Sequence, residues 1–179
     1  SVLHKRVGKE LVERLSLVDL SPRHILDLGC GTGWCAALLS HRFGQSAVVG
    51  LDLSEAMLRA GEKTTGSGFI NGDAHRLPLA DQCVDLIFSN LLLPWCDTQI
   101  VFSEACRVLR PGGLFTFSSC GPDSLRELAA AWAMVDDGPH VHAFSDMHDL
   151  GDSLAQSGFS EPVMDVEMLT FTYRTLEAL

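Results

Sequence analysis

Asp27-Leu28-Gly29-Cys30-Gly31-Thr32-Gly33 follows the short apolar run that begins at His24 and precedes a segment whose apolar residues have helical spacing. Three glycines within five positions permit backbone conformations with positive φ and let the main chain approach a ligand closely. The spacing differs from the G-x-G-x-x-G loop of dinucleotide-binding proteins. The third glycine of that loop would lie three positions after Gly31 or Gly33, where this sequence has Trp34 and Ala36. A purely structural turn between strand and helix is the alternative interpretation.

Outward from this loop, short apolar runs alternate with segments of helical spacing along the whole chain. The predicted strands are residues 24–28, 47–53, 69–72, 84–89, 114–119 and 162–172. The predicted helices are residues 2–18, 33–43, a segment from 54, 97–109, 123–135 and 146–157. Strands that are continuously apolar are typical of sheets buried on both faces. The pattern therefore predicts a single α/β domain over residues 1–179, a doubly wound and mostly parallel sheet with helices on both faces.

Composition limits the classes of function. Of the 179 residues 46% are apolar and 20% are charged, which indicates a globular protein. The net charge of −10 argues against a nucleic-acid partner, and no apolar run approaches the roughly 20 residues that cross a bilayer, so a membrane is not expected as a partner either. The six cysteines form no C-x-x-C pair, which indicates reduced, buried thiols in a cytoplasmic protein.

The charge is unevenly distributed along the chain. Residues 1–110 hold 11 Lys and Arg against 12 Asp and Glu, whereas residues 111–179 hold 2 against 11. Lys5, Arg6 and Lys9 lie close together near the amino terminus. We therefore expect an acidic macromolecular partner to bind at the amino-terminal end, with an ordinary solvated helix face as the alternative.

Polar residues stand at the ends of three further predicted strands. Asp52 lies 21 residues beyond Gly31, near the separation of about 20 at which an acid accepts hydrogen bonds from a ribose. The segment 71–74 follows the third strand and contains Asp73, whose carboxylate can accept from an exocyclic amine, and Ser89-Asn90-Leu91 ends the fourth. Taken alone, Asp52 is equally suited to be the first acid of the next helix. Because the carboxyl ends of parallel strands meet at one sheet edge, where such sheets bind ligands, the set predicts a nucleoside site.

On these residues the sequence resembles the class I S-adenosylmethionine-dependent methyltransferases over nearly its whole length. Residues 27–33 are similar to the first motif of that family, and Arg110-Pro111-Gly112-Gly113 is similar to its lead into the fifth strand. The resemblance implies that the chain binds S-adenosylmethionine and releases S-adenosylhomocysteine. It implies that the loop backbone lies near the methionine part, Asp52 at the ribose, 73–74 at the adenine and 90–91 facing the methyl group. The cofactor-binding residues that it implies are Asp27, Gly29, Cys30, Gly31, Gly33, Asp52, Leu53, Asp73, Ala74, Asn90 and Leu91.

A narrower resemblance covers residues 89–173. The stretches 89–96, 117–128 and 144–173 are similar to the BioC branch, the malonyl-acyl-carrier-protein O-methyltransferases of biotin precursor synthesis. This implies a cytoplasmic enzyme whose acceptor is the free carboxyl of malonyl-acyl-carrier protein or of a small-molecule thioester. A methyltransferase-like protein of the branch that acts on another small molecule or protein, or a non-catalytic assembly factor, is the alternative. Compared with the family pattern, we expect the domain to be shortened at both ends and to lack the last antiparallel strand.

The resemblance leaves the catalytic residues open. A malonyl acceptor needs no general base, because its carboxylate is already the nucleophile near neutral pH, and transfer then depends on positioning and desolvation. Arg126 is the candidate for binding that carboxylate, with a surface helix residue as the alternative. Trp95 is the candidate for a pocket wall, or else packs under the next helix. Two histidines of the set His140, His142 and His148 flank one valine and resemble a chelating pair, but the family uses no metal and none is expected.

Overall fold

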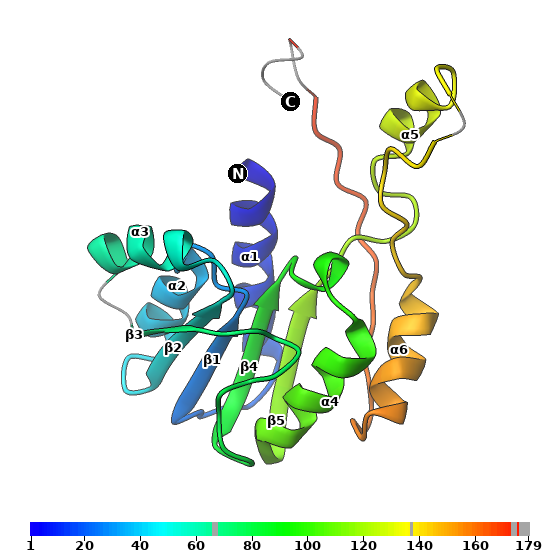
Figure 1. Cartoon of the computed structure of the whole chain (residues 1–179). Coiled ribbons are helices and arrows are strands. Elements are labelled where there is room, and N and C mark those ends of the chain that lie inside the picture. The colour runs from blue at the N-terminus through cyan, green and yellow to red at the C-terminus, as the bar shows by residue number, and fades with distance from the viewer. Residues whose placement is uncertain (66–67, 137, 173–174, 176–179) are drawn as a thin grey trace.

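The computed structural model describes residues 1–65, 68–136, 138–172 and 175. Its centre is a five-stranded sheet in the order β3-β2-β1-β4-β5, with every neighbouring pair parallel (Figure 1). The carboxyl ends of all five strands therefore lie at the same edge of the sheet. The strands are β1 His24–Leu28, β2 Ala47–Asp52, β3 Gly68–Asn71, β4 Val84–Asn90 and β5 Leu109–Ser118.

Helices cover both faces of the sheet, as the alternation predicts (Figure 1). Contacts link α1, α2 and α3 on one side, and α4 contacts α6 on the other. The helices are α1 Val2–Arg14, α2 Trp34–Arg42, α3 Glu55–Thr65, α4 Thr98–Val108, α5 Arg126–Trp132 and α6 Met147–Gln156, with short 3₁₀ turns η1 Leu15–Leu17 and η2 Leu93–Trp95. The prediction of a doubly wound α/β fold is confirmed, and within the described residues the sheet is wholly parallel.

Two apolar cores form because consecutive strand residues point to opposite faces. On β1, Ile25 packs with α1 and α2, whereas its neighbour Leu26 packs with α4 and α6. On β4, Leu86 likewise packs on the side of α1 and α2, and Ile87 packs on the side of α4 and α6. Strands with two buried faces explain why their sequences read as continuous apolar runs instead of alternating ones.

Helix starts follow local chemistry. Asp97 caps α4, since its Oδ1 accepts from the backbone N–H of Ile100 at 3.3 Å, and Asp146 caps α6 by accepting from the N–H of His148 at 2.8 Å. The helix predicted over 123–135 is shorter in the structure, where α5 begins after Leu125. Leu125 has φ 59°, a left-handed conformation that a helix cannot include.

The prediction of a strand over 162–172 is wrong. Residues 159–172 form no ladder with any described strand, and an extended segment becomes a strand only when its backbone has a partner. Side chains hold the segment instead, because Arg14 on α1 donates to Asp165 at 2.6 Å and Arg6 lies 3.8 Å from Glu167. Phe159 and Met164 pack against the core, whereas Val163, Val166 and Met168 remain exposed.

Within the described residues, no helix combines the length and the apolar character that crossing a membrane requires.

Substitution of Phe102 tests the packing of the apolar core between the sheet and α4. It is fully buried and lies 5.9 Å from the ring of Phe115 and 5.6 Å from the ring of Phe117, centroid to centroid. We expect Phe102→Ala to lower the free energy of unfolding by about 3–5 kcal/mol in urea titrations, because it leaves a cavity. The matched control is Ile100→Ala on the same helix, which is 45% exposed and is expected to cost less than about 1 kcal/mol. Equal losses in the two variants would contradict this packing.

Candidate functional site

The glycine loop lies between β1 and α2 at the carboxyl edge of the sheet. The backbone N–H groups of Gly29 and Cys30 both donate to the carbonyl oxygen of Leu51 on β2, at 2.8 and 3.0 Å. Gly29 has φ 73°, and a Cβ at this position would lie 2.9 Å from a methyl carbon of Leu92, just beyond β4. Only glycine therefore permits the loop to lie so close to the segment after β4.

Asp52, at the end of β2, is joined directly to this loop. Its Oδ2 accepts from the backbone N–H of Gly31 at 2.8 Å, and its Oδ1 accepts from the N–H of Ser54 at 2.8 Å. Each carboxylate oxygen has two lone pairs, so each keeps capacity for a further donor such as a sugar hydroxyl. Leu53 follows with 73% of its surface exposed, beside the loop.

Asp27 lies at the base of the loop and is buried. Its Oδ2 has no hydrogen-bond partner among the described residues, although the N–H of Ala36 donates to the carboxyl group. Burial raises the pKa of Asp27 to about 7, the Ala36 N–H opposes this rise, and the negative charge of Asp52 adds to it. An orphaned buried oxygen of this kind is rare and indicates a place where a donor is expected.

Cys30 contributes its backbone to the loop rather than its side chain. The thiol is buried against Gly50 of β2, where a Cβ would lie only 2.7 Å from the sulfur. Burial, with the nearby charges of Asp27 and Asp52, raises the pKa of Cys30 above its usual range. The thiol therefore stays protonated and acts as an apolar filler beneath the loop.

The end of β3 is fastened to the end of β2. Asn71 donates from Nδ2 to the carbonyl oxygens of Asp52 (3.1 Å) and Leu53 (2.9 Å). Asp73 then accepts from the backbone N–H of His75 at 2.9 Å and lies 2.7 Å from its Nδ1, and these groups lower the pKa of Asp73. Ala74 is buried in the core. The Asp73 carboxylate remains half exposed at the edge.

At the end of β4, Asn90 and Leu91 are held by β5 and by α1. Ser118 Oγ donates to Asn90 Oδ1 at 2.9 Å, and Asn90 Nδ2 donates to the carbonyl oxygen of His4 at 3.0 Å. Leu91 has φ 58°, in the left-handed region, although it is not glycine. Helix α1 comes this close because residue 8 is glycine: a Cβ there would lie 3.0 Å from Asn90 Nδ2.

The residues predicted at the strand ends therefore form one continuous set. The glycine loop contacts the segment after β4 on one side and Asp52 on the other, and Asp52 is joined through Asn71 to the end of β3. Sequence reasoning missed the supporting residues Gly8 and Ser118, and it named Asn71 only as part of the segment 71–74. A glycine inside an otherwise regular amphipathic helix was the available signal for Gly8, since it costs stability and so needs a reason.

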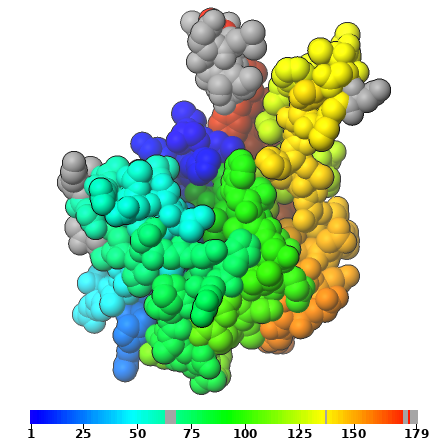
Figure 2. All heavy atoms as spheres, viewed as in Figure 1, coloured from blue at the N-terminus to red at the C-terminus, as the bar shows by residue number. Residues whose placement is uncertain are grey.

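The candidate acceptor residues lie further out. Trp95 is 72% exposed and its ring meets that of His142 edge-on at 5.2 Å. Arg126, on α5, donates from Nε to Glu127 Oε1 at 3.3 Å. Helix α5 and the amino-terminal end of α1 both lie beyond the carboxyl edge of the sheet (Figure 1), and the yellow stretch that contains α5 projects from the body of the molecule (Figure 2). The roles of Trp95 in a pocket wall and of Arg126 in carboxylate binding stay predictions.

The histidines are divided among separate contacts. His140 Nε2 lies 2.6 Å from Asp136 Oδ1 and its ring stacks on Trp132, while His148 is paired with Asp146, which caps α6. Within residues 1–65, 68–136, 138–172 and 175, no three His, Cys, Asp or Glu side chains come together as a metal site would require.

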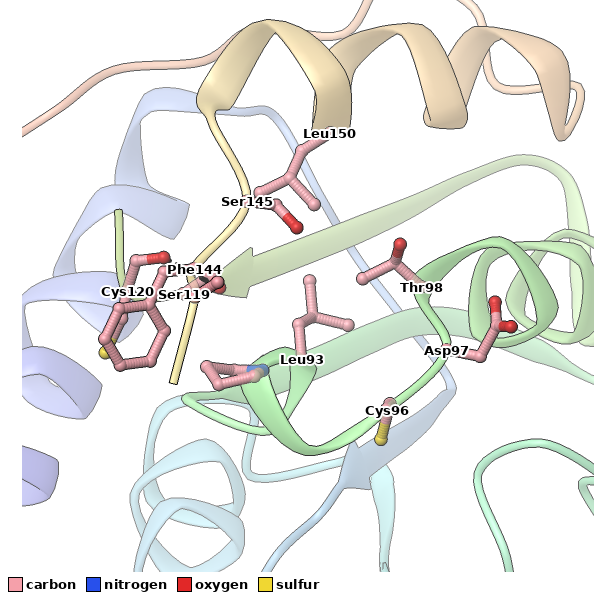
Figure 3. Close-up of a pocket in the computed structure, with 11 residues that line it drawn as sticks. Leu93, Cys96, Asp97, Thr98, Ser119, Cys120, Phe144, Ser145 and Leu150 are labelled. Atoms are coloured by element: carbon pink, nitrogen blue, oxygen red, sulfur yellow. Dashed lines mark hydrogen bonds between the residues drawn. The ribbon is translucent and has the colours of Figure 1, made fainter. Parts of the chain in front are cut away.

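A cavity of about 260 Å³ lies beside this edge, between η2, the end of β5 and the stretch that leads into α6 (Figure 3). In that view Leu93 and Leu150 extend toward each other across it, and Phe144 lies by Cys120. Its lining is mostly uncharged, with Asp97 as the ionisable carboxylate. The lining residues are Leu93, Pro94, Cys96, Asp97, Thr98, Ser119, Cys120, Ala143, Phe144, Ser145 and Leu150.

Comparison with known proteins gives a consistent result. Residues 26–117 match a family described as Methyltransferase domain. The chain is 43% identical to the malonyl-acyl-carrier-protein O-methyltransferase of Methylovorus sp. over 97% of its length, and 44% identical to malonyl-acyl-carrier-protein O-methyltransferase 1 of Coxiella burnetii over 98%. It spans 62% and 60% of those two relatives, about six tenths of their length.

Among solved structures, an S-adenosylmethionine-dependent methyltransferase of Mesorhizobium loti is similar with a TM-score of 0.67 and 28% identity, covering 86% of this chain and 81% of that one. The geranyl diphosphate C-methyltransferase of Streptomyces coelicolor, solved with S-adenosyl-L-homocysteine, has a TM-score of 0.69 at 19% identity, covering 86% and 62%. At that identity the second likeness concerns the fold alone.

The buried Asp27 predicts a pH dependence of stability. Its folded-state pKa of about 7 lies above the ordinary value of 3.8, so the folded protein holds this proton while the unfolded chain releases it. The free energy of unfolding therefore falls as pH rises from about 4 to about 7, by on the order of a few kcal/mol. Asp27→Asn removes this dependence. We therefore expect the free energy of unfolding of the variant, measured in urea titrations, to rise relative to that of wild type between pH 4.5 and pH 8.

Asp85→Asn is the matched control. Burial acts to raise the pKa of Asp85. Hydrogen bonds from Arg110 and from the N–H groups of His24 and Arg23 outweigh burial and lower this pKa to about 2. Its contribution to stability is present above pH 3.8 and is lost only toward pH 2, so its difference from wild type stays constant from pH 4.5 to pH 8. If the difference in free energy of unfolding between Asp27→Asn and wild type were also constant over this range, the raised pKa of Asp27 would be contradicted.

Proposed function

The chain belongs to the methyltransferase domain family, and we propose that it transfers the methyl group of S-adenosylmethionine to the free carboxyl group of a malonyl unit on acyl carrier protein. The observation that carries the proposal is the identity of about 40% with malonyl-acyl-carrier-protein O-methyltransferases over nearly the whole chain. The similarity covers 97% to 100% of the chain and so extends beyond the glycine loop into the carboxy-terminal half. The proposed setting is biotin precursor synthesis in the cytoplasm.

The residues at the carboxyl edge fit S-adenosylmethionine. The unpartnered Oδ2 of Asp27 supports a place for the positively charged amino group of the methionine part. The free lone pairs of Asp52 suit the ribose hydroxyls, and the exposed Leu53 suits the flat face of an adenine. The half-exposed Asp73 carboxylate suits the exocyclic amine of that base. When bound, this molecule supplies a methyl group on a positively charged sulfur.

The chain's own task in the reaction is to position the acceptor and exclude water. A malonyl carboxylate is ionised near neutral pH and needs no proton removed, so the lack of an assigned general base agrees with this acceptor. The cavity between η2 and the end of β5 offers room beside the segment 90–91. Since its lining brings no cation, a separate basic residue has to hold the carboxylate, and Arg126 remains our candidate.

The acidic carrier is proposed to bind at α1. Lys5, Arg6, Lys9 and Arg14 lie on this helix, against Glu10 and Glu13. Three of these cations already form ion pairs, because Arg14 pairs with Asp165 and Glu167, Arg6 pairs with Glu10 and Glu167, and Lys9 pairs with Glu13. A carrier would compete with Glu13 for the exposed Lys9, and with Asp165 and Glu167 for the arginines. The charge on α1 supports an acidic partner, and not a neutral one.

The test compares two acceptors that share one chemical group. We expect transfer of a labelled methyl group from S-adenosylmethionine to malonyl-acyl-carrier protein, with malonyl-coenzyme A as a weaker acceptor. The triple variant K5E/R6E/K9E is expected to raise KM for the carrier substrate at least about ten-fold at low salt, because the steering charges are reversed. Its rate with malonyl-coenzyme A should remain unchanged.

Arg59→Glu, which reverses an exposed cation of α3, is the matched control and should change neither KM. If the triple variant binds the carrier as well as wild type does, the docking surface lies elsewhere. If S-adenosylmethionine binds and neither malonyl acceptor is methylated, the acceptor is another small molecule or protein. Failure to bind S-adenosylmethionine would favour a non-catalytic assembly factor.

A further inference from the structure

Leu91 has a backbone conformation that needs support. Its φ of 58° lies in the left-handed region, which is costly for a residue with a branched side chain and is found mainly where surrounding contacts enforce it. The residue is buried and follows β4 directly, so it belongs to the segment 90–91, for which the family resemblance implies a place facing the methyl group. The geometry of this turn therefore decides what the carboxyl edge presents to the reacting atoms.

One side chain, that of Ser118, supplies the support. Ser118 lies opposite Asn90 in the parallel pairing of β5 with β4. The backbone N–H of Leu91 donates both to Ser118 Oγ and to the Ser118 carbonyl oxygen, at 3.1 Å each. The hydroxyl hydrogen of Ser118 then goes to Asn90 Oδ1 at 2.9 Å. The single hydroxyl group thus accepts from the left-handed residue and donates to the residue before it.

The bond from Ser118 also sets the orientation of the Asn90 amide. Because Oδ1 accepts from Ser118, Nδ2 faces the other way, donates to the His4 carbonyl oxygen on α1 at 3.0 Å and lies 3.9 Å from the sulfur of Cys35. Gly8 permits this approach, since a Cβ there would lie 2.7 Å from that sulfur. Hydrogen bonds therefore connect Ser118 on β5 to Asn90 on β4, and Asn90 to His4 on α1.

We propose that Ser118 is a positioning residue, which fixes the left-handed turn at Leu91 and, through Asn90, holds helix α1 over the carboxyl edge. The inference rests on the proposed methyl transfer for its catalytic consequence. Ser118 itself touches neither donor nor acceptor in this account. It acts through Asn90 and Leu91, so loss of its hydroxyl group disturbs the alignment of the reacting atoms more than the binding of either substrate.

The first measurement needs no ligand. Amide hydrogen exchange of the free chain is compared for wild type, Ser118→Ala and Ser118→Thr. In Ser118→Ala we expect exchange at Leu91 and along α1 to be about ten-fold faster, because one hydrogen bond to each of Leu91 and Asn90 is lost. Ser118→Thr keeps the hydroxyl group and should exchange as wild type does. The matched control is Ser103→Ala on α4, whose Oγ donates to the carbonyl oxygen of Gln99 only.

The second measurement separates kcat from KM in the methyl-transfer assay. For Ser118→Ala we expect kcat to fall about ten- to a hundred-fold while KM for S-adenosylmethionine changes less than about three-fold, with recovery in Ser118→Thr. Wild-type exchange rates in Ser118→Ala would overturn the coupling to α1, and an unchanged kcat would overturn the positioning role. A wild-type chain that transfers no methyl group contradicts the proposed function instead, and the exchange data then decide the coupling alone.

Discussion

The carbonyl oxygen of Leu51 accepts two backbone hydrogen bonds, from Gly29 and Cys30, and this pair holds the glycine loop against β2. The bonds require a loop that turns back at once after β1, which positive φ at Gly29 permits. Asp52, the next residue of β2, is thereby brought to the N–H of Gly31. The remaining features of the carboxyl edge are arranged around this junction of β1 and β2.

Parallel pairing extends the junction to the other strands. Since β1 is central and all neighbouring strands are parallel, Asp52, Asn71 and Asn90 lie at one edge although they are 19 to 38 residues apart in the chain. Helix α1 closes the edge from one face through Gly8, and the segment before α6 borders the cavity on the other. The buried oxygen of Asp27 has no partner among the described residues, which costs stability, and we interpret it as a place for a donor group of a ligand.

Local patterns predicted the sheet and the candidate residues of its edge, because strand periodicity, glycine turns and polar strand ends are properties of short stretches. They did not predict the contacts of Ser118 and Gly8 with Asn90, which join residues 28 and 82 positions apart and depend on how strands and helices pack. The prediction of a strand over 162–172 was wrong for a related reason. Val163 and Val166 suit a strand by composition, but they are 93% and 71% exposed because no described strand pairs with them.

Binding of the reaction product tests the central claim most directly, because it depends on the carboxyl edge and not on the acceptor. Titration calorimetry of S-adenosylhomocysteine into the wild-type chain is predicted to show one site per chain. Asp52→Ala should weaken that binding at least about ten-fold, because the charged acceptor of the ribose hydroxyl groups is lost. Absence of binding to the wild type, or equal affinity in Asp52→Ala, would contradict the account.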